Sequence, residues 1–372
     1  MECLERPGWN SYTREELMKI TVKAPDEDIR RRILRNFDHI AKPIDSLGRF
    51  EALAAQIGAV QGTEKIDISK KAVIIMCADN GIVEEGISQS GQEVTLAVVK
   101  NMADRKSSVG RMAEVAGADT IPVDIGVNHK EKIPGVVDKK IAFGTRNFRK
   151  EPAMTEDEAV RAIFTGIEMV SECKEKGYKL LATGEMGIGN TTTSSAIAAA
   201  LLKCEAAEVT GRGAGLSDEK LIHKQKLIAE AIDQYGLKEA DALQVLRTVG
   251  GLDIAGLTGV CIGGALYQVP VVLDGVISMA AALLAERIVP GTKDYLLPSH
   301  KGKEPAVERL AKELGIEPVI DGGLALGEGT GAVMMFSLLD MALSVYQDSA
   351  SFSDIRIKQY ERFCNSSDKL NS

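Results

Sequence analysis

The sequence is poor in the residues that build disulfide frameworks and metal sites. Its six cysteines are spread along the chain without a C-x-x-C pair, and its four histidines show no zinc-ligand spacing. We therefore expect no disulfide framework, no bound metal and no other cofactor. Scattered cysteines of this kind fit reduced thiols in a cytoplasmic protein.

A surplus of positive charge is also absent. The net charge is −8 and the basic residues are scattered, so neither a nucleic acid nor an anionic membrane is an expected partner. Residues 254–273 carry no charge and are long enough to cross a bilayer. Aspartates flank this stretch and two glycines and a proline interrupt it, so we expect a buried helix to about Tyr267 and then a short strand. The opening residues, MECLERPGWN, contain acids and a proline where a signal peptide has an apolar core, and no leader is expected.

The sequence does contain short apolar runs that end in an acid and glycine, with helical patterns between most of them. These runs are AVIIMCADNG, ADTIPVDIGV, KLLATGEMGIGN, VPVVLDGVIS and EPVIDGGLALGEGTG. The alternation predicts an α/β fold, with a parallel sheet and helices on both of its faces. Residues 1–65 and 336–372 show helical patterns only. We therefore expect one small helical domain built from both ends of the chain, around a large α/β domain of residues 66–335.

Acidic residues stand at the ends of the predicted strands, namely Asp79, Asp124, Glu185, Asp274 and Glu328. Ligands of open parallel sheets bind beyond the carboxyl ends of the strands, so these acids are candidates for one site. Aspartate also ends strands well without any function. Glutamate is a poor turn residue, and Glu185 and Glu328 are therefore the stronger candidates.

The segment ATGEMGIGNTTTSS, residues 182–195, combines a glycine-rich turn with the start of a predicted helix. Its glycines permit a close approach of the backbone, and Asn190 or Thr191 can cap the helix. The N–H groups of a first helical turn form an anion site, so the segment predicts a phosphate-binding turn. It is not a P-loop, because no G-K-[ST] follows. The segments GRGAGLSDEKLIHK, with Lys224, and SHKGKEP are further candidates for binding an anion.

Eight sequence blocks in order resemble the nicotinate-nucleotide–dimethylbenzimidazole phosphoribosyltransferase family of cobalamin synthesis. The blocks are KPIDSLGRFEALAAQIGAVQGT, CADNGIVEEGISQSGQEVT, TGEMGIGNTTTSSAI, GRGAGLSDE, GGLDIAGLTG, VVLDGVIS, SHKGKEP and LALGEGTGAV. The resemblance implies a Rossmann-like large domain and a homodimer in which the neighbouring subunit's small domain completes each active site. It also implies transfer of the phosphoribosyl group from nicotinate mononucleotide to 5,6-dimethylbenzimidazole.

The resemblance, together with the strand-end and helix-start residues, gives the expected site. Glu328 would be the catalytic base, and Glu185 would stabilise the ribosyl cation or position the nucleotide. The expected contacts of nicotinate mononucleotide are Gly187, Asn190, Thr191, Gly213, Lys224, Asp274 and Gly275. The expected contacts of the aromatic base are Asp79, Gln92 and Leu326.

Elementary chemistry accounts for two carboxylates. The glycosidic nitrogen of nicotinate mononucleotide is a pyridinium, so its ring departs neutral and needs no general acid. The incoming benzimidazole loses a proton as it attacks, which requires one base, and a second carboxylate stabilises the oxocarbenium-like ribose.

Three positions depart from the family pattern, namely Asn80, Gly91 and Gly302, where histidine, proline and serine are usual. The first two lie near the expected base pocket, which leaves other benzimidazoles, purines or phenols open as acceptors. Two other functions are alternatives: a non-catalytic phospho-sugar-binding protein and a nicotinamide-dependent oxidoreductase. The second fits less well, because LALGEGTGAVM has a G-x-G-x-x-A pattern only after the last strand.

Overall fold

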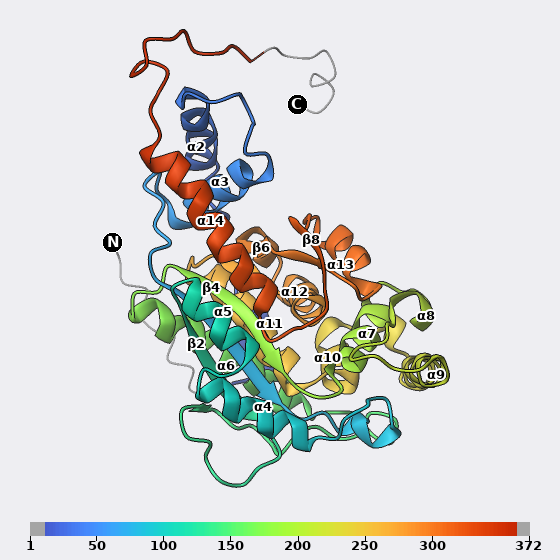
Figure 1. The fold of residues 1–372 in the computed structure, drawn as a ribbon. Coiled ribbons are helices and arrows are strands. Elements are labelled where there is room, and N and C mark those ends of the chain that lie inside the picture. The colour runs from blue at the N-terminus through green and yellow to red at the C-terminus, as the bar shows by residue number, and fades with distance from the viewer. Residues whose placement is uncertain (1–11, 363–372) are drawn as a thin grey trace. The chain divides into compact units, whose positions relative to one another are not determined.

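The computed structural model describes residues 12–362, which form two units (Figure 1). Residues 12–24 and Ile68–Phe336 form the large unit, and Pro25–Asp67 with residues 337–362 form the small one. The sequence predicted that the small domain includes residues 1–65, but residues 12–24 belong to the large unit. Residues 1–11 and 363–372, which were also expected in the small domain, lie outside the described residues. Helix α1 (Arg14–Lys19) belongs to the large unit because its Leu17 is fully buried in the core of that unit.

The large unit is built on a six-stranded sheet with the order β3-β2-β1-β4-β5-β6, in which every pair of neighbours is parallel. The predicted α/β fold with a parallel sheet is confirmed. The strands are β1 (Lys71–Ala78), β2 (Ala118–Gly126), β3 (Val137–Asp138), β4 (Leu180–Met186), β5 (Val271–Leu273) and β6 (Leu296–Pro298). Strands β1 and β4 are buried along their whole length, because helices cover both faces of the sheet.

The last predicted strand was wrongly assigned to the main sheet. Strand β8 (Ile320–Leu324) pairs with β7 (His300–Gly302) in a separate two-stranded parallel sheet. Its sequence, IDGGL, is exposed at three of its five residues, whereas the central strand β1 of the main sheet is buried along its whole length. Glu328 therefore follows a strand of the small sheet.

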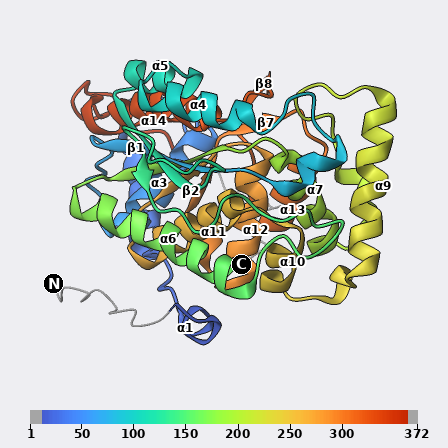
Figure 2. The ribbon, with the colours of Figure 1, turned by 90° about the horizontal axis from the view of Figure 1, so that it is seen from below.

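Helices flank the main sheet on both sides (Figure 2). Helices α4 and α5 lie on one side, and α6, α11 and α12 lie on the other. The helices of the large unit after α1 are α4 (Glu93–Ala103), α5 (Ser108–Val115), α6 (Glu156–Glu175), α7 (Asn190–Leu201), α8 (Ala206–Val209), α9 (Asp218–Gln234), α10 (Ala242–Val249), α11 (Leu252–Leu266), α12 (Val276–Ile288) and α13 (Ala306–Leu314). Short 3₁₀ helices occur at Gly81–Glu85, Leu237–Glu239 and Thr292–Tyr295.

The uncharged stretch after Asp253 forms the buried helix α11 and then β5, as expected. Its glycines let α11 approach α6 very closely, since a Cβ at Gly259 would lie 1.8 Å from the carbonyl oxygen of Ile163. Within residues 12–362, no helix has the length and apolar character needed to cross a membrane.

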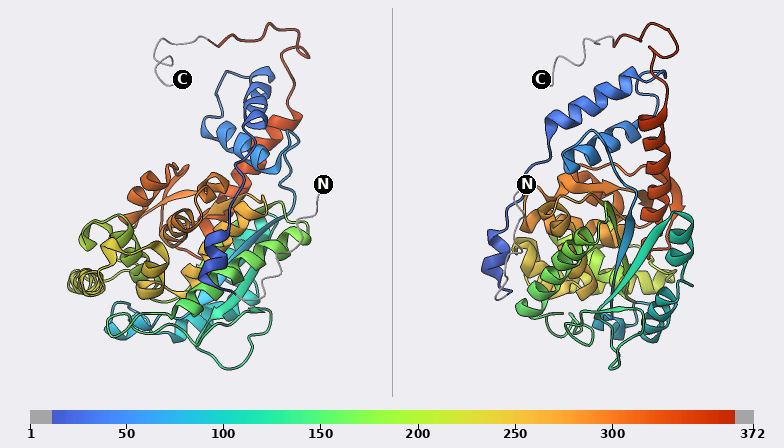
Figure 3. Two further views of the ribbon diagram at one scale, coloured as in Figure 1. Left: turned by 180° about the vertical axis from the view of Figure 1, so that it is seen from behind. Right: turned by 90° about the vertical axis from the view of Figure 1, so that its left-hand side faces the viewer.

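The small unit contains α2 (Glu27–His39), α3 (Arg49–Gln61) and the second half of α14 (Thr330–Asp348), which come from opposite ends of the chain (Figure 3). Helix α2 is amphipathic and buries Ile29, Ile33 and Phe37. The Phe37 ring packs against the Tyr346 ring with a centroid distance of 4.8 Å. Apolar packing of this kind holds the two chain ends together.

Candidate active site

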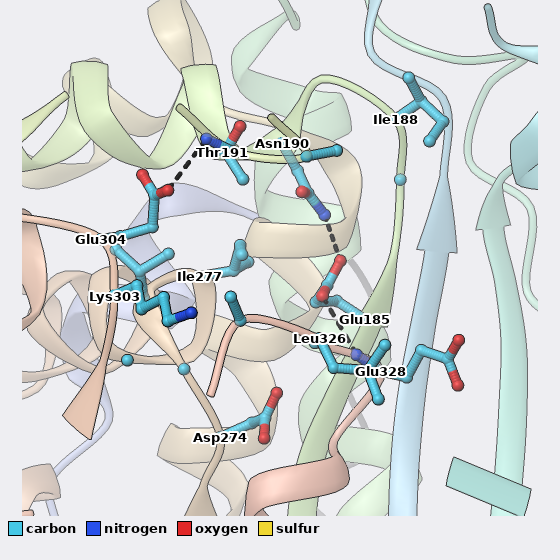
Figure 4. A pocket seen from close by; sticks show the side chains of 18 of the residues that line it. Glu185, Ile188, Asn190, Thr191, Asp274, Ile277, Lys303, Glu304, Leu326 and Glu328 are labelled. Atoms are coloured by element: carbon cyan, nitrogen blue, oxygen red, sulfur yellow. Dashed lines mark hydrogen bonds between the residues drawn. The ribbon is translucent and has the colours of Figure 1, made fainter. Parts of the chain in front are cut away.

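A cavity of about 290 Å³ opens at the carboxyl ends of β4 and β5 in the large unit (Figure 4). Its walls come from residues 87–89 and Val98, the turn between β4 and α7, the loop at residues 212–216, the start of α12, the segment around β7 and residues 324–328. This is the edge at which parallel sheets of this kind bind ligands.

The turn after β4 brings the backbone close to its neighbours. A Cβ at Gly187 would lie 2.6 Å from both the carbonyl oxygen of Ala78 and Oδ2 of Asp253. Gly189 is the N-cap of α7 and has a φ of 95°, a conformation that favours glycine. The expected capping role of Asn190 or Thr191 is therefore wrong. The Asn190 amide turns inward instead, where it bonds to two acids.

Glu185 is a buried acid in the cavity wall. Its Oε2 accepts a hydrogen bond from Asn190, and its Oε1 accepts one from the backbone N–H of Glu328 at 3.4 Å (Figure 4). Burial raises the pKa of Glu185 to about 8, and the nearby charges of Asp253 and Asp274 contribute to the rise. In these surroundings the ionised form of Glu185 is stabilised most when a positive charge arrives in the cavity.

Asp274 lies at the end of β5 and organises the loop that carries Glu328. Its Oδ1 accepts hydrogen bonds from the N–H groups of Gly331 at 2.9 Å and Ala332 at 3.3 Å. Its Oδ2 accepts one from Gly329 at 3.2 Å. The carboxylate thus binds the first turn of α14, which fixes the backbone on both sides of residue 329.

Glu328 has an unusual backbone conformation for a residue other than glycine, with a φ of 62° between two glycines that also have positive φ. Such a conformation costs roughly 1–2 kcal/mol, and it is frequent at functional sites. The Glu328 Oε2 accepts a hydrogen bond from the N–H of Val109 at the start of α5, at 2.9 Å. The side chain is directed away from Lys303 and Glu304 (Figure 4).

Two lysines stand on the other side of the cavity, Lys303 in its wall and Lys224 behind it. Lys224 is fully buried behind Thr191, and its Nζ donates to Thr191 Oγ1 at 3.0 Å and to the Gly211 carbonyl at 3.3 Å. Burial lowers the pKa of Lys224 to about 8. Lys303 lines the cavity directly. Together these groups form a region suited to a phosphate.

Most of the residues expected from the sequence lie in the cavity wall. They are Glu185, Gly187, Asn190, Thr191, Gly213, Asp274, Gly275, Leu326 and Glu328. Lys224 stands one layer behind, at Thr191. Asp79 and Gln92 do not line the cavity.

The positions of Asp79 and Gln92 have a clear structural reason. Asp79 is buried at the end of β1 and accepts a hydrogen bond from the N–H of Asn128 at 2.8 Å. Gln92 donates to the carbonyl of Asn80 at 3.1 Å. Both side chains thus form hydrogen bonds with neighbouring backbone groups, and Gln92 links the start of α4 to the residues after β1.

Sequence reasoning missed several side chains of this region as individual site residues. His300 is buried with its Nδ1 3.9 Å from Oδ1 of Asp274, and Glu304 accepts a hydrogen bond from the N–H of Gly213 at 2.9 Å. Both belong to the segment SHKGKEP, which was expected to bind an anion only as a block. Asp253 lies within GGLDIAG, where nothing in the spacing singled it out.

This chain is similar in sequence to proteins of known family. A family model described as "Phosphoribosyltransferase" matches residues 22–357. The nicotinate-nucleotide–dimethylbenzimidazole phosphoribosyltransferase of Acetivibrio thermocellus is 44% identical over 88% of this chain and 94% of its own length. The enzyme of that name from Clostridium perfringens strain 13 is 40% identical over 90% of this chain and 92% of its own length.

A solved structure is also similar. The crystal structure of CobT from Thermus thermophilus superimposes with a TM-score of 0.85 and 35% sequence identity, covering 90% of this chain and 100% of that chain. The matches define a phosphoribosyltransferase. The chain belongs to the nicotinate-nucleotide–dimethylbenzimidazole phosphoribosyltransferase family, and the resemblance seen in the sequence is confirmed.

Proposed function

We propose that this protein transfers the 5-phosphoribosyl group of nicotinate mononucleotide to 5,6-dimethylbenzimidazole, which yields α-ribazole 5′-phosphate and nicotinate. The observation that carries the proposal is the adjacency of Glu185 and Glu328 in one wall of the cavity, where the carboxylate of the first accepts the backbone N–H of the second at 3.4 Å. On the other side of the cavity, Lys303 and the Thr191–Lys224 pair would bind the phosphate of the nucleotide.

Cleavage of the bond between ribose C1′ and the pyridinium nitrogen runs ahead of bond formation to the acceptor. The electron pair of the broken bond goes to that nitrogen. Nicotinate therefore leaves with a neutral ring, and positive charge develops on the ribose. In its ionised form Glu185 stabilises this charge electrostatically, because its carboxylate lacks a cationic partner of its own among the described residues.

The acceptor attacks C1′ through one nitrogen from the face opposite the leaving group, which inverts the configuration from β to α. Its second nitrogen loses a proton, and Glu328 is the base that takes it. For this step the Glu328 side chain turns from the N–H of Val109 toward the acceptor, while Asp274 holds its backbone.

We also propose that the protein is a cytoplasmic homodimer in which the partner's small unit completes the site. Leu326, at the cavity wall, is 56% exposed although it is a large apolar residue, which fits a position that a second molecule covers. Light scattering of the purified protein tests the dimer, since a monomeric mass would exclude it.

The reaction itself is tested by mixing purified protein with nicotinate mononucleotide and 5,6-dimethylbenzimidazole. We expect equal amounts of released nicotinate and α-ribazole 5′-phosphate. A phospho-sugar-binding protein or an oxidoreductase would release no nicotinate. A parallel panel of substituted benzimidazoles, a purine and a phenol identifies the preferred acceptor by its kcat/KM.

A further inference from the structure

Three polar side chains from different elements meet at the cavity wall: Glu185 and Asn190 line the cavity, and Asp253 lies directly behind them. Asp253 lies in the first turn of α11 and is fully buried. Its Oδ2 accepts a hydrogen bond from Asn190 Nδ2 at 2.9 Å, and the same nitrogen donates to Oε2 of Glu185. A side-chain amide has two N–H groups, so each carboxylate takes one of them. The amide of Asn190 therefore links Asp253 to Glu185.

The surroundings leave Asp253 little freedom. Its Oδ1 accepts a hydrogen bond from the N–H of Ile254 at 3.0 Å, which anchors the carboxylate to its own helix. A Cβ at Gly251 would lie 2.3 Å from Oδ1, and one at Gly187 would lie 2.6 Å from Oδ2. The backbone at Gly251 and Gly187 therefore lies against the two carboxylate oxygens of Asp253. A side chain held in this way orients Asn190, and through it Glu185.

The charge around this network is predominantly negative. The titratable groups that face Glu185 from the neighbouring elements are Asp253 of α11, Asp274 after β5, Cys77 of β1, Glu328 before α14 and, beside Asp274, His300. Lys224 reaches only Thr191 and the Gly211 carbonyl, and Lys303 stands elsewhere in the cavity wall. Among residues 12–362, no lysine or arginine forms an ion pair with Glu185 or Asp253.

We propose that Asp253 is a positioning residue for the phosphoribosyl transfer, which acts through Asn190 to aim the Glu185 carboxylate and to keep it free of a resident counter-charge for the cation that develops at ribose C1′. The proposal deepens the proposed function and rests on it for the identity of that cation. An anion that has no resident counter-charge is stabilised most by the charge that the reaction creates. A lysine in place of Asp253 would instead satisfy Glu185 before the substrate arrives.

The same geometry predicts a measurable change in the protonation of Glu185 when Asp253 is replaced. Burial raises the pKa of Glu185 and also raises the pKa of Asp253, to about 6 for the latter, and the Asp253 charge contributes to the shift of Glu185. Removing the charge at residue 253 therefore lowers the pKa of Glu185. This shift reports the charge coupling between the two acids, and the kcat and rate-profile measurements below test whether the coupling serves catalysis.

The first test needs no enzymatic activity. Protein labelled with ¹³C at the glutamate side-chain carboxyls is titrated by NMR, and the resonance that disappears in Glu185→Gln is assigned to Glu185. We expect the titration midpoint of Glu185 to fall by about one pH unit in Asp253→Asn, because one like charge is removed at hydrogen-bonding distance from their shared amide. Asp124→Asn is the matched control, since Asp124 is a buried acid at a strand end that pairs with Lys140 at 2.8 Å. That variant should leave the midpoint unchanged.

The second test measures how substitution of Asp253 changes turnover. The kcat/KM for nicotinate mononucleotide should rise with pH through the ionisation of Glu185, and this rise should move to lower pH by the same amount in Asp253→Asn and Asp253→Ala. The asparagine variant keeps an oxygen that can accept from Asn190, so its kcat should exceed that of the alanine variant at least about tenfold. If the alanine variant does not fold, the asparagine variant carries the test.

The outcomes separate this inference from the proposed function. A wild-type protein that releases no nicotinate refutes the transferase activity, whereas the NMR midpoint still reports on Asp253. An unchanged midpoint in folded Asp253→Asn overturns the inference even if the wild-type enzyme is active. A shifted midpoint with an unshifted rate profile would show that Asp253 sets the charge of Glu185 without serving catalysis, which also overturns the proposal.

Discussion

Replacement of Asp274 by alanine tests whether one buried carboxylate holds the loop of Glu328 in its left-handed conformation. The substitution removes three hydrogen bonds, to the N–H groups of Gly329, Gly331 and Ala332. A hydrogen bond to a charged group contributes about 1.5 kcal/mol or more, but the three share one carboxylate, so we expect a loss of about 3 kcal/mol in the free energy of unfolding. At roughly 2 °C per kcal/mol for a chain of this size, Tm should fall by about 6 °C.

The same variant should lose activity for a local reason. Without the carboxylate the loop relaxes from the positive φ of residues 327–329, and the Glu328 side chain is displaced. A displacement of about 1 Å at a catalytic group costs on the order of 100-fold in rate, so kcat should fall at least that far.

Thr155→Ala is a suitable control for the Asp274 variant. Thr155 caps α6 by accepting the N–H of Glu158 at 3.1 Å, and it lies outside the cavity wall. Its loss should cost about 1 kcal/mol and leave kcat unchanged. Thermal unfolding by scanning calorimetry and nicotinate release measure the two effects. The reasoning is refuted if Asp274→Ala melts no lower than Thr155→Ala or turns over at the wild-type rate.

Three further predictions address single side chains. Glu328→Gln should lower kcat by roughly 10²- to 10⁴-fold and leave the calorimetric Kd of nicotinate mononucleotide nearly unchanged, and a wild-type kcat would exclude Glu328 as the base. Lys224→Met should raise the KM for nicotinate mononucleotide about tenfold by removing the ammonium behind Thr191, whereas an unchanged KM would place the phosphate elsewhere. Because the pKa of Glu185 is raised to about 8, the folded state binds a proton that the unfolded chain has lost between its ordinary pKa and that value. Stability should therefore fall as pH rises through this window, by at most about 1.4 kcal/mol per pH unit, and urea titrations of Glu185→Gln should lack this component.

The sequence was sufficient for the main architecture because its strong signals are local. Apolar runs that end in an acid and glycine predicted β1, β2, β4 and β5, and the alternation with helices predicted a parallel sheet. The assignment of β8 failed, because an apolar run shows that a strand forms but not which strand it pairs with. Residues 12–24 were misassigned for a similar reason, since burial of Leu17 in the core of the large unit is a long-range contact.

The candidate site could be predicted where a residue is chemically unusual for its position. Glutamate in a glycine-rich turn singled out Glu185 and Glu328, and both lie in the cavity wall. The direction of a side chain was not predictable, so the bond from Val109 to Glu328 and the inward turn of Asn190 were both missed. Asp253 was missed because it meets Glu185 only when α11 packs against the turn after β4.

The most direct test is a crystal structure of Glu328→Gln with nicotinate mononucleotide bound. We expect ribose C1′ to lie between the carboxylate of Glu185 and the side chain of residue 328, with the phosphate beside Lys303 and Thr191. A nucleotide bound with its ribose away from both positions would contradict a shared role for the two acids.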